Sequence, residues 1–200
     1  MAGMSDNDPL APEPGEREPA PEPLALVQSF VNTNDIEAEQ DELGNADALR
    51  AWLESRDLLP VGSRVGAADL ERALAVREGL RALATANAGG SAEPSEIERL
   101  NRSAVTLPLL TEFSPQLEWE LVPGKAGVPG ALGHILSVAV RAMADGTWAR
   151  MKACLNDECR WLFYDHSRNH SGTWCTMAVC GNRMKARTYR QRHRPGSQDG

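Results

Sequence analysis

The stretch Cys154–Arg194 reads CLNDECRWLFYDHSRNHSGTWCTMAVCGNRMKARTYRQRHR and holds all four cysteines of the chain. Two pairs, Cys154 with Cys159 and Cys175 with Cys180, each enclose four residues, and fifteen residues separate the pairs. A tetrahedral metal ion takes two ligands from each of two such turns, and the connecting loop folds the second pair onto the first. Four thiolates leave no open coordination position. The spacing therefore predicts one structural Zn²⁺ ion per chain, bound by these four side chains.

Other interpretations of the cysteines stay open at this point. An iron–sulfur cluster also uses four thiolates, and spacing alone does not exclude it. A pair of redox disulfides is less favoured, because neither pair has the Cys-x-x-Cys spacing of oxidoreductases. His166, His170 or His193 could ligate the metal in place of a cysteine. Clustered cysteines in a reducing compartment are more often metal ligands than disulfides, which favours the zinc site.

Charge is distributed unevenly along the chain. The formal net charge is −7, yet residues 150–194 hold ten Lys or Arg against the acids Asp157, Glu158 and Asp165. An acidic body with a basic end is typical of a nucleic-acid contact confined to that end. A basic helix that only contacts solvent is the competing interpretation.

The basic segment that follows Cys180 is predicted to be a helix, because 184–193 contains no Pro or Gly. Ala186 and Tyr189 are expected to pack on the metal module. A row of arginines on one helix face is unfavourable without counter-charges, and phosphates would supply them. Ion pairs with the acidic body of the same or another subunit are the alternative. The candidate nucleic-acid contacts are Arg168, Arg183, Lys185, Arg187, Arg190, Arg192 and Arg194.

The aromatic residues near the cysteines, Trp161, Phe163 and Trp174, are expected to form a small core on one side of the metal, because apolar groups shield thiolates from water. Stacking on exposed bases is the alternative role.

The rest of the chain predicts a mostly helical domain. Residues 1–22 are acidic and rich in proline and are expected to be disordered, as are residues 195–200. The helical domain is assigned to 23–147 and the zinc finger to 148–194. The fold class is mainly α (α+β), a helical N-terminal domain with a short β element followed by a small four-cysteine zinc-finger module that ends in a basic helix.

Hydrophobic periodicity locates the elements of that domain. Helices are predicted at 46–55, 67–87, 94–103 and 131–144, and a hairpin at 106–113 with 117–122. Residues 24–33 fit either a buried strand or a helix, and 147–152 a short extended segment. The expected core residues are Leu49, Trp52 and Leu53; Leu70, Ala73, Leu74, Val76, Leu80 and Leu83; and Leu132, Ile135, Leu136, Ala139, Val140 and Met143.

The motifs of the C-terminal quarter occur in order in a known family. Cys154, Cys159 with the stretch Arg160–Asn169, Trp174–Met177 and the tetrapeptide Cys180-Gly181-Asn182-Arg183 resemble the CGNR zinc finger. Upstream, Phe30–Thr33, the helix at Leu49–Leu53 and Val76-Arg77-Glu78 resemble the ABATE domain that usually precedes this finger. The resemblance covers residues 24–194. It implies a bacterial, stress-induced transcription regulator whose finger binds zinc through the four cysteines and binds DNA.

The expected function is therefore that of a zinc-dependent nucleic-acid-binding protein, a bacterial DNA-binding transcription regulator. The alternative is a zinc-knuckle adaptor for proteins, with a helical domain that senses a small molecule. No Gly-rich phosphate loop, His-Glu-x-x-His motif or Ser-nucleophile elbow occurs in the sequence, so an enzyme is not expected. No apolar run approaches the ~20 residues of a membrane span. A cytoplasmic protein that forms a homodimer is compatible with these features.

Overall fold

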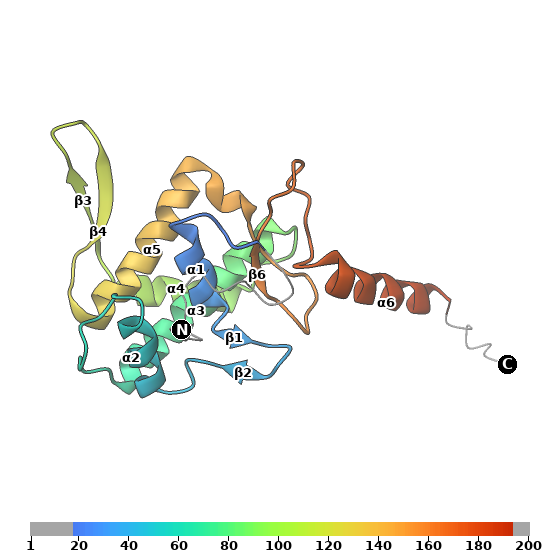
Figure 1. Ribbon diagram of the computed structural model, residues 1–200, viewed down its shortest axis with the longest axis horizontal. Helices are drawn as coiled ribbons and strands as arrows, with labels where there is room; N and C mark the ends of the chain where they lie inside the picture. The colour runs from blue at the N-terminus through green and yellow to red at the C-terminus, as the bar shows by residue number, and fades with distance from the viewer. Residues whose placement is uncertain (1–17, 194–200) are drawn as a thin grey trace, which may run out of the picture.

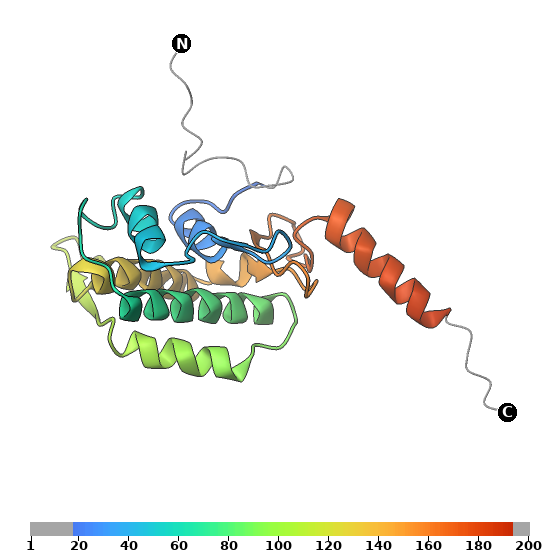
Figure 2. The same cartoon turned by 90° about the horizontal axis from the view of Figure 1, so that it is seen from below.

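Three helices that run side by side form the body of the protein (Figure 2). The computed structural model describes residues 18–193. The central helix α3 (Ala67–Asn87) packs on α4 (Pro94–Ala104) along one side and on α5 (Gly127–Asp145) along the other. The shorter helices α1 (Leu24–Val31) and α2 (Ala46–Glu54) also pack against α3.

Local sequence explains where these helices begin and end. The Asn45 side chain accepts the Ala48 N–H at 2.9 Å and caps α2. Pro94 begins α4, where its missing N–H has no helical partner to lose. Gly146, at φ +83°, ends α5 in the left-handed conformation that glycine adopts without strain.

Three two-stranded antiparallel sheets accompany the helices within residues 18–193. Strands β3 (Leu109–Phe113) and β4 (Trp119–Pro123) form the predicted hairpin, which projects from the body in Figure 1. The other two sheets were not predicted, because their strands are only two or three residues long. They are β1 (Asn34–Asp35) with β2 (Gln40–Asp41), and β5 (Met151–Ala153) with β6 (Leu162–Tyr164).

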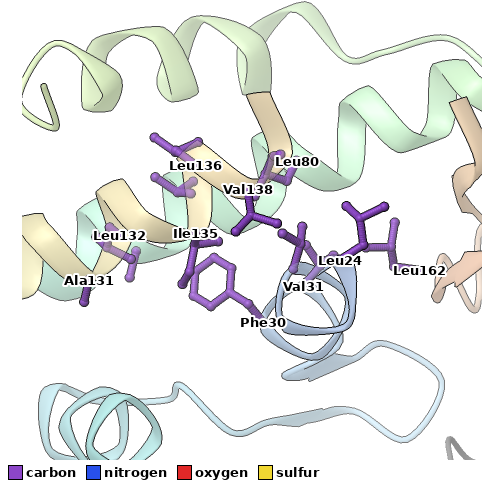
Figure 3. Close-up of a cluster of buried hydrophobic side chains, with 14 of the residues drawn as sticks. Leu24, Phe30, Val31, Leu80, Ala131, Leu132, Ile135, Leu136, Val138 and Leu162 are labelled. Atoms are coloured by element: carbon purple, nitrogen blue, oxygen red, sulfur yellow. The ribbon is translucent and has the colours of Figure 1, made fainter. Parts of the chain in front are cut away.

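The hydrophobic core lies between α1, α3 and α5 and extends into the cysteine-bearing region (Figure 3). Phe30, Leu80 and Ile135 are nearly or completely buried at its centre. Met151, Ala153 and Leu162, from β5 and β6, belong to the same core and are fully buried. The first half of the predicted zinc finger is therefore packed as part of the body.

The predicted fold class is confirmed, since helices predominate and the cysteine cluster near the C-terminus is followed by a helix. The ambiguous segment 24–33 is the helix α1, and α5 begins at Gly127, four residues before the predicted start. The predicted inward position of Val140 and Met143 is wrong, because they are 40% and 38% exposed. The segment 147–150 forms a 3₁₀ turn, η1 (Thr147–Arg150), where an extended chain was expected.

Part of the predicted N-terminal tail is ordered against the body. Residues 1–17 and 194–200 lie outside the described part of the chain. Within the predicted tail, Ala20 is buried and its N–H donates to Gln28 Oε1 at 2.6 Å.

Helix α5 is long and apolar enough to cross a membrane, but 61% of the relevant stretch is buried inside the protein, as in a core helix.

Candidate metal centre and basic helix

The four cysteine sulfurs lie close together at the C-terminal side of the body. All four Sγ atoms are within 4.8 Å of one another. The Cys175 Sγ is 3.6 Å from the sulfurs of both Cys159 and Cys180. A tetrahedron of thiolates about a zinc ion at ~2.3 Å has sulfur–sulfur edges of about 3.8 Å, whereas a disulfide requires about 2.05 Å. The residues present therefore fit a single metal ion.

Two backbone turns bring the sulfurs together. The first joins β5 to β6, where the N–H groups of Cys159 and Arg160 both donate to the Asn156 carbonyl, at 2.8 and 3.0 Å. The second is the π-helical turn η2 (Met177–Gly181), which contains Cys180 and is capped by the Thr176 hydroxyl. The Asn156 side chain connects the two turns by donating to the Cys180 sulfur at 3.7 Å.

The crowded thiols of the cysteines perturb one another's pKa. Hydrogen bonds from Cys159 and Cys175 lower the pKa of the Cys154 thiol to about 2. The same bond to Cys154 raises the pKa of Cys159 to about 12, and bonds to both neighbours also raise the pKa of Cys175. A bound dication favours all four thiolates, so metal binding releases protons.

The apolar surroundings of the sulfurs are smaller than predicted. Trp161 is buried against the sulfurs and Trp174 is half-buried beside them, as expected for a shield against water. Phe163 is buried but does not belong to this cluster. The cluster of potential ligands in residues 18–193 consists of the four cysteines. Of the histidines, His166 lies 3.1 Å from the Pro19 carbonyl and His193 stacks on Tyr189.

A buried ion pair supports the loop between the two turns. Lys152 and Asp165 are each 3% exposed, and their side chains meet at 2.8 Å. Lys152 also donates to the carbonyls of His170 and Gly172, while Asp165 accepts the N–H groups of Ser167 and Gly172. Burial opposes ionisation, but these hydrogen bonds hold the pKa of Asp165 well below its usual range. The pair thus fixes the course of the chain towards Cys175.

Side chains of the helical body hold the first turn directly. Arg81 is fully buried and donates to the Arg160 carbonyl at 2.7 Å, to the Val31 carbonyl at 2.8 Å and to Glu78. Arg160 is in the left-handed conformation, at φ +51°. The Asn32 side chain accepts the Leu162 N–H and donates to the Leu162 carbonyl. The turn with Cys159 is therefore anchored to α1 and α3.

Helix α6 (Asn182–Arg192) follows η2 directly and projects away from the body (Figure 1). Its main contacts are with η2. The prediction that Ala186 and Tyr189 pack on the metal module is wrong, because both are exposed, Tyr189 by 64%. Helix α6 projects from the module into solvent, so neither side chain is buried against the cysteines.

The predicted nucleic-acid contacts occupy different positions. Arg183 forms an ion pair with Glu37, in the loop between β1 and β2, so one contact with the acidic body does exist. Arg168 is exposed in the loop between β6 and Cys175, Arg192 ends α6, and Arg194 lies outside the described residues. Between Arg183 and Arg192, the exposed cations of α6 are Lys185, Arg187 and Arg190.

Sequence reasoning missed the buried polar residues that support the site, namely Arg81, Lys152, Asn156 and Asp165. Arg81 offered a signal, because it lies seven residues after Leu74, on the same side of the helix, and so interrupts the apolar side. Lys152 and Asp165 offered none, because isolated charges of this kind are usually exposed.

The fold and the site define a class of protein in which a helical domain is joined to a four-cysteine zinc finger that ends in a basic helix. Residues 24–146 match the family model ABATE, described as "Putative stress-induced transcription regulator", and residues 150–193 match the CGNR zinc finger. The chain belongs to the ABATE family and carries a C-terminal CGNR zinc finger, so the predicted family is confirmed. A comparison with curated proteins finds no match.

Proposed function

We propose that the protein is a bacterial transcription regulator that binds double-stranded DNA through α6, with one structural Zn²⁺ ion per chain. The observation that carries the proposal is the position of α6, which begins two residues after Cys180 and projects from the body (Figure 2). Its cations Lys185, Arg187 and Arg190 are exposed to solvent. The family description as a transcription regulator supports the same function.

The sulfur geometry supports zinc over an iron–sulfur cluster. Sulfurs within 4.8 Å of one another suit one ion at their centre. A multi-iron cluster places its thiolates on different irons and therefore farther apart. Cys154, Cys159, Cys175 and Cys180 would hold the ion, and its chemistry there is structural, because four thiolates fill a tetrahedral coordination sphere. We accordingly propose no catalytic activity.

The electrostatics of α6 support DNA as the partner. Arg187 and Arg190 are exposed on one side of the helix, near the position of Arg183. Arginine forms bidentate hydrogen bonds with phosphates and with guanine in the major groove, which admits a helix. Arg183 would exchange its surface ion pair with Glu37 for a phosphate at little loss, because exposed ion pairs contribute little to stability.

Fluorescence anisotropy with a pool of labelled random-sequence duplexes tests the proposal. If the six candidate side chains from Arg183 to Arg194 each contact a phosphate, the logarithm of the affinity falls with the logarithm of salt with a slope of about −5. The charge-reversal variant R187E/R190E should abolish binding at physiological salt while keeping one zinc per chain in elemental analysis. The variant R64E/R102E changes the charge equally at exposed sites of the body and serves as the control. Unchanged binding by R187E/R190E would contradict the assignment.

A cleft beside α5 favours a second candidate function, the sensing of a small molecule by the helical domain. The cleft has a volume of about 550 Å³ and lies between α5, β4 and the start of α1. Leu24, Leu121 and Val138 give it apolar walls, with Glu22 and Tyr164 among its polar groups. This volume is typical of ligand pockets, ~300–1,000 Å³. A thermal-shift screen with common metabolites tests the idea, and the absence of any shift would leave the domain as a scaffold.

The adaptor alternative uses the same arginines on an acidic protein partner. Affinity capture from a bacterial lysate treated with nuclease distinguishes it from DNA binding, because an adaptor would retain a protein and shift no duplex.

A cytoplasmic location goes with the proposed DNA-binding function and is tested by cell fractionation.

A further inference from the structure

The hairpin of β3 and β4 exposes a group of large apolar side chains at its tip. Phe113 and Trp119 lie opposite each other across the two strands and are 78% and 41% exposed, and Leu117 in the turn is 93% exposed. The base of the hairpin is packed, since Leu109 contacts the core. Soluble proteins seldom expose adjacent large apolar groups without a partner, which indicates an interaction surface at the tip.

The same tip is acidic. Glu112 and Glu120 are directly opposite each other across the strands, where like charges are destabilising. Glu112, Glu118 and Glu120 form no ion pair with another described residue. Residues Glu112, Phe113, Glu118, Trp119 and Glu120 line one hollow of about 740 Å³.

Arg141 shows how this surface binds a guanidinium group. It borders the hollow, donates to the Trp119 carbonyl at 2.7 Å and lies 4.9 Å from the centre of the Trp119 ring. Its hydrogen bond to a carbonyl leaves the carboxylates free to bind further cations. Arginine pairs with carboxylates and stacks on aromatic faces, so the tip fits an arginine-bearing segment.

Helix α6 is an arginine-bearing segment of this kind, and it lies at the opposite end of the molecule from the hairpin (Figure 1). Lys185, Arg187 and Arg190 are exposed and form no ion pair with another residue of 18–193. The hairpin and α6 of one chain are too far apart to meet. Two chains that lie antiparallel would place each hairpin beside the partner's α6, and both contacts would then be equivalent.

We propose that the tip of the β3–β4 hairpin receives α6 of a second copy of this chain, in a dimer with two-fold symmetry. Arg187 and Arg190 contact Glu112, Glu120 and the aromatic pair of the partner. The dimer does not depend on the proposed DNA binding. One α6 cannot bind the partner's hairpin and DNA at the same time, because both contacts use the same arginines.

A charge swap tests the dimer by sedimentation, with DNA absent. The variant E112K/E120K makes the tip basic and keeps a like-charged pair across the strands, so the hairpin itself gains or loses little. The variant R187E/R190E makes α6 acidic. In each variant alone, both contacts become repulsive, and the dissociation constant of the dimer should rise by at least about 100-fold. The variant R64E/R102E is the charge-matched control and should dimerise like the wild type.

An equimolar mixture of the two variants is the decisive measurement. One contact in the mixed dimer is then the wild-type pair and the other is the reversed pair, so dimerisation should return to within about tenfold of the wild-type dissociation constant. This recovery also shows that both variants fold. A wild-type protein that sediments as a monomer at low salt, a dimer unaffected by either reversal, or a mixture that stays monomeric would each overturn the proposal.

Discussion

Helices α3 and α6 are stabilised by different means, although both are regular helices of one chain. Helix α3 has 21 residues and buries Ala73, Val76 and Leu80 against its neighbours. Helix α6 has 11 residues and is exposed at every position whose side chain is described, apart from the half-buried Met184. An isolated helix of that length is marginal in water. The body therefore relies on buried apolar surface, and α6 relies on the turn that precedes it.

The boundary between these two kinds of stabilisation runs through the zinc finger itself. Strands β5 and β6, with the turn that carries Cys159, are packed in the main core and bonded to Arg81 and Asn32. The second half, from Cys175 to the end of α6, contacts the body through fewer groups, such as the ion pair of Arg183 with Glu37. Because a metal bound by all four cysteines would join the two halves, its removal should affect them unequally.

Metal removal should produce the largest change. Structural zinc contributes ~10 kcal/mol or more in small zinc modules, so Cys180→Ser or a chelator should release the second half of the finger. We expect amides of 174–193 to lose protection in hydrogen exchange, while those of β5 and β6 keep theirs. The exposed loop variant Ser171→Ala is the control. Unchanged protection in α6 after metal removal, shown by elemental analysis, would refute the proposed dependence on metal.

Arg81→Leu should produce the next-largest loss of stability, because it removes the link between α3 and the first turn. The substitution leaves the carbonyls of Val31 and Arg160 without the buried Arg81 donor and removes one of the two arginines that pair with Glu78. Loss of one partner from a buried charged network destabilises proteins by about 3–5 kcal/mol. The loss should be measured as the free energy of unfolding in urea.

The control for that measurement is Arg72→Leu in the same helix. Arg72 pairs with Asp69 one turn away at a half-exposed position, so less than about 1 kcal/mol should be lost. Equal effects of the two substitutions would show that the buried contacts of Arg81 do not hold the turn.

Asp165→Asn tests the buried ion pair, and the stability that it removes depends on pH. The amide keeps the shape but leaves Lys152 without its counter-charge, for an expected loss of about 3 kcal/mol near neutral pH. The pKa of Asp165 is lowered in the folded state, so its contribution is complete above the unfolded value of ~3.9 and is lost as the pH falls through the folded value.

The two proteins should therefore differ by a constant free energy of unfolding between about pH 5 and 7, and converge at lower pH. Urea titrations of metal-loaded wild type and Asp165→Asn across this range measure the difference. A difference that already shrinks between pH 7 and 5 would contradict the lowered pKa.

Much of the body could be predicted from the sequence, because its helices are amphipathic and carry recognisable ends. Helix α3 has the predicted bounds, and Asn45 and Pro94 mark the starts of α2 and α4. The four cysteines were equally visible, because their spacing predicts the cluster of sulfurs that the structure shows. In these places local sequence and final structure depend on the same residues.

The rest could not be predicted, because it depends on contacts between distant residues. Strands β5 and β6 are three residues each and are stabilised by burial against α1 and α3. The direction of α6 follows from the π-helical turn at Met177–Gly181, for which the sequence gives no periodic signal. Tyr189 was expected to pack on the metal module, and the direction of α6 carries it into solvent.

The smallest expected effects come from two glycines that test how tightly the body is packed. A Cβ atom at Gly79 in α3 would lie 2.5 Å from the Leu100 Cβ of α4, whereas one at Gly133 in α5 would meet Pro123 at an ordinary 3.4 Å. Alanine favours a helix by up to about 1 kcal/mol over glycine at both sites. At Gly79 the overlap should outweigh this gain and destabilise the protein by about 1–2 kcal/mol. At Gly133 the gain should remain, since no backbone must move.

Thermal unfolding of Gly79→Ala and Gly133→Ala should therefore shift the melting temperature in opposite directions. A rise for both would show that α3 and α4 can separate without loss, and that the close contact of the two helices adds little to the stability of the body.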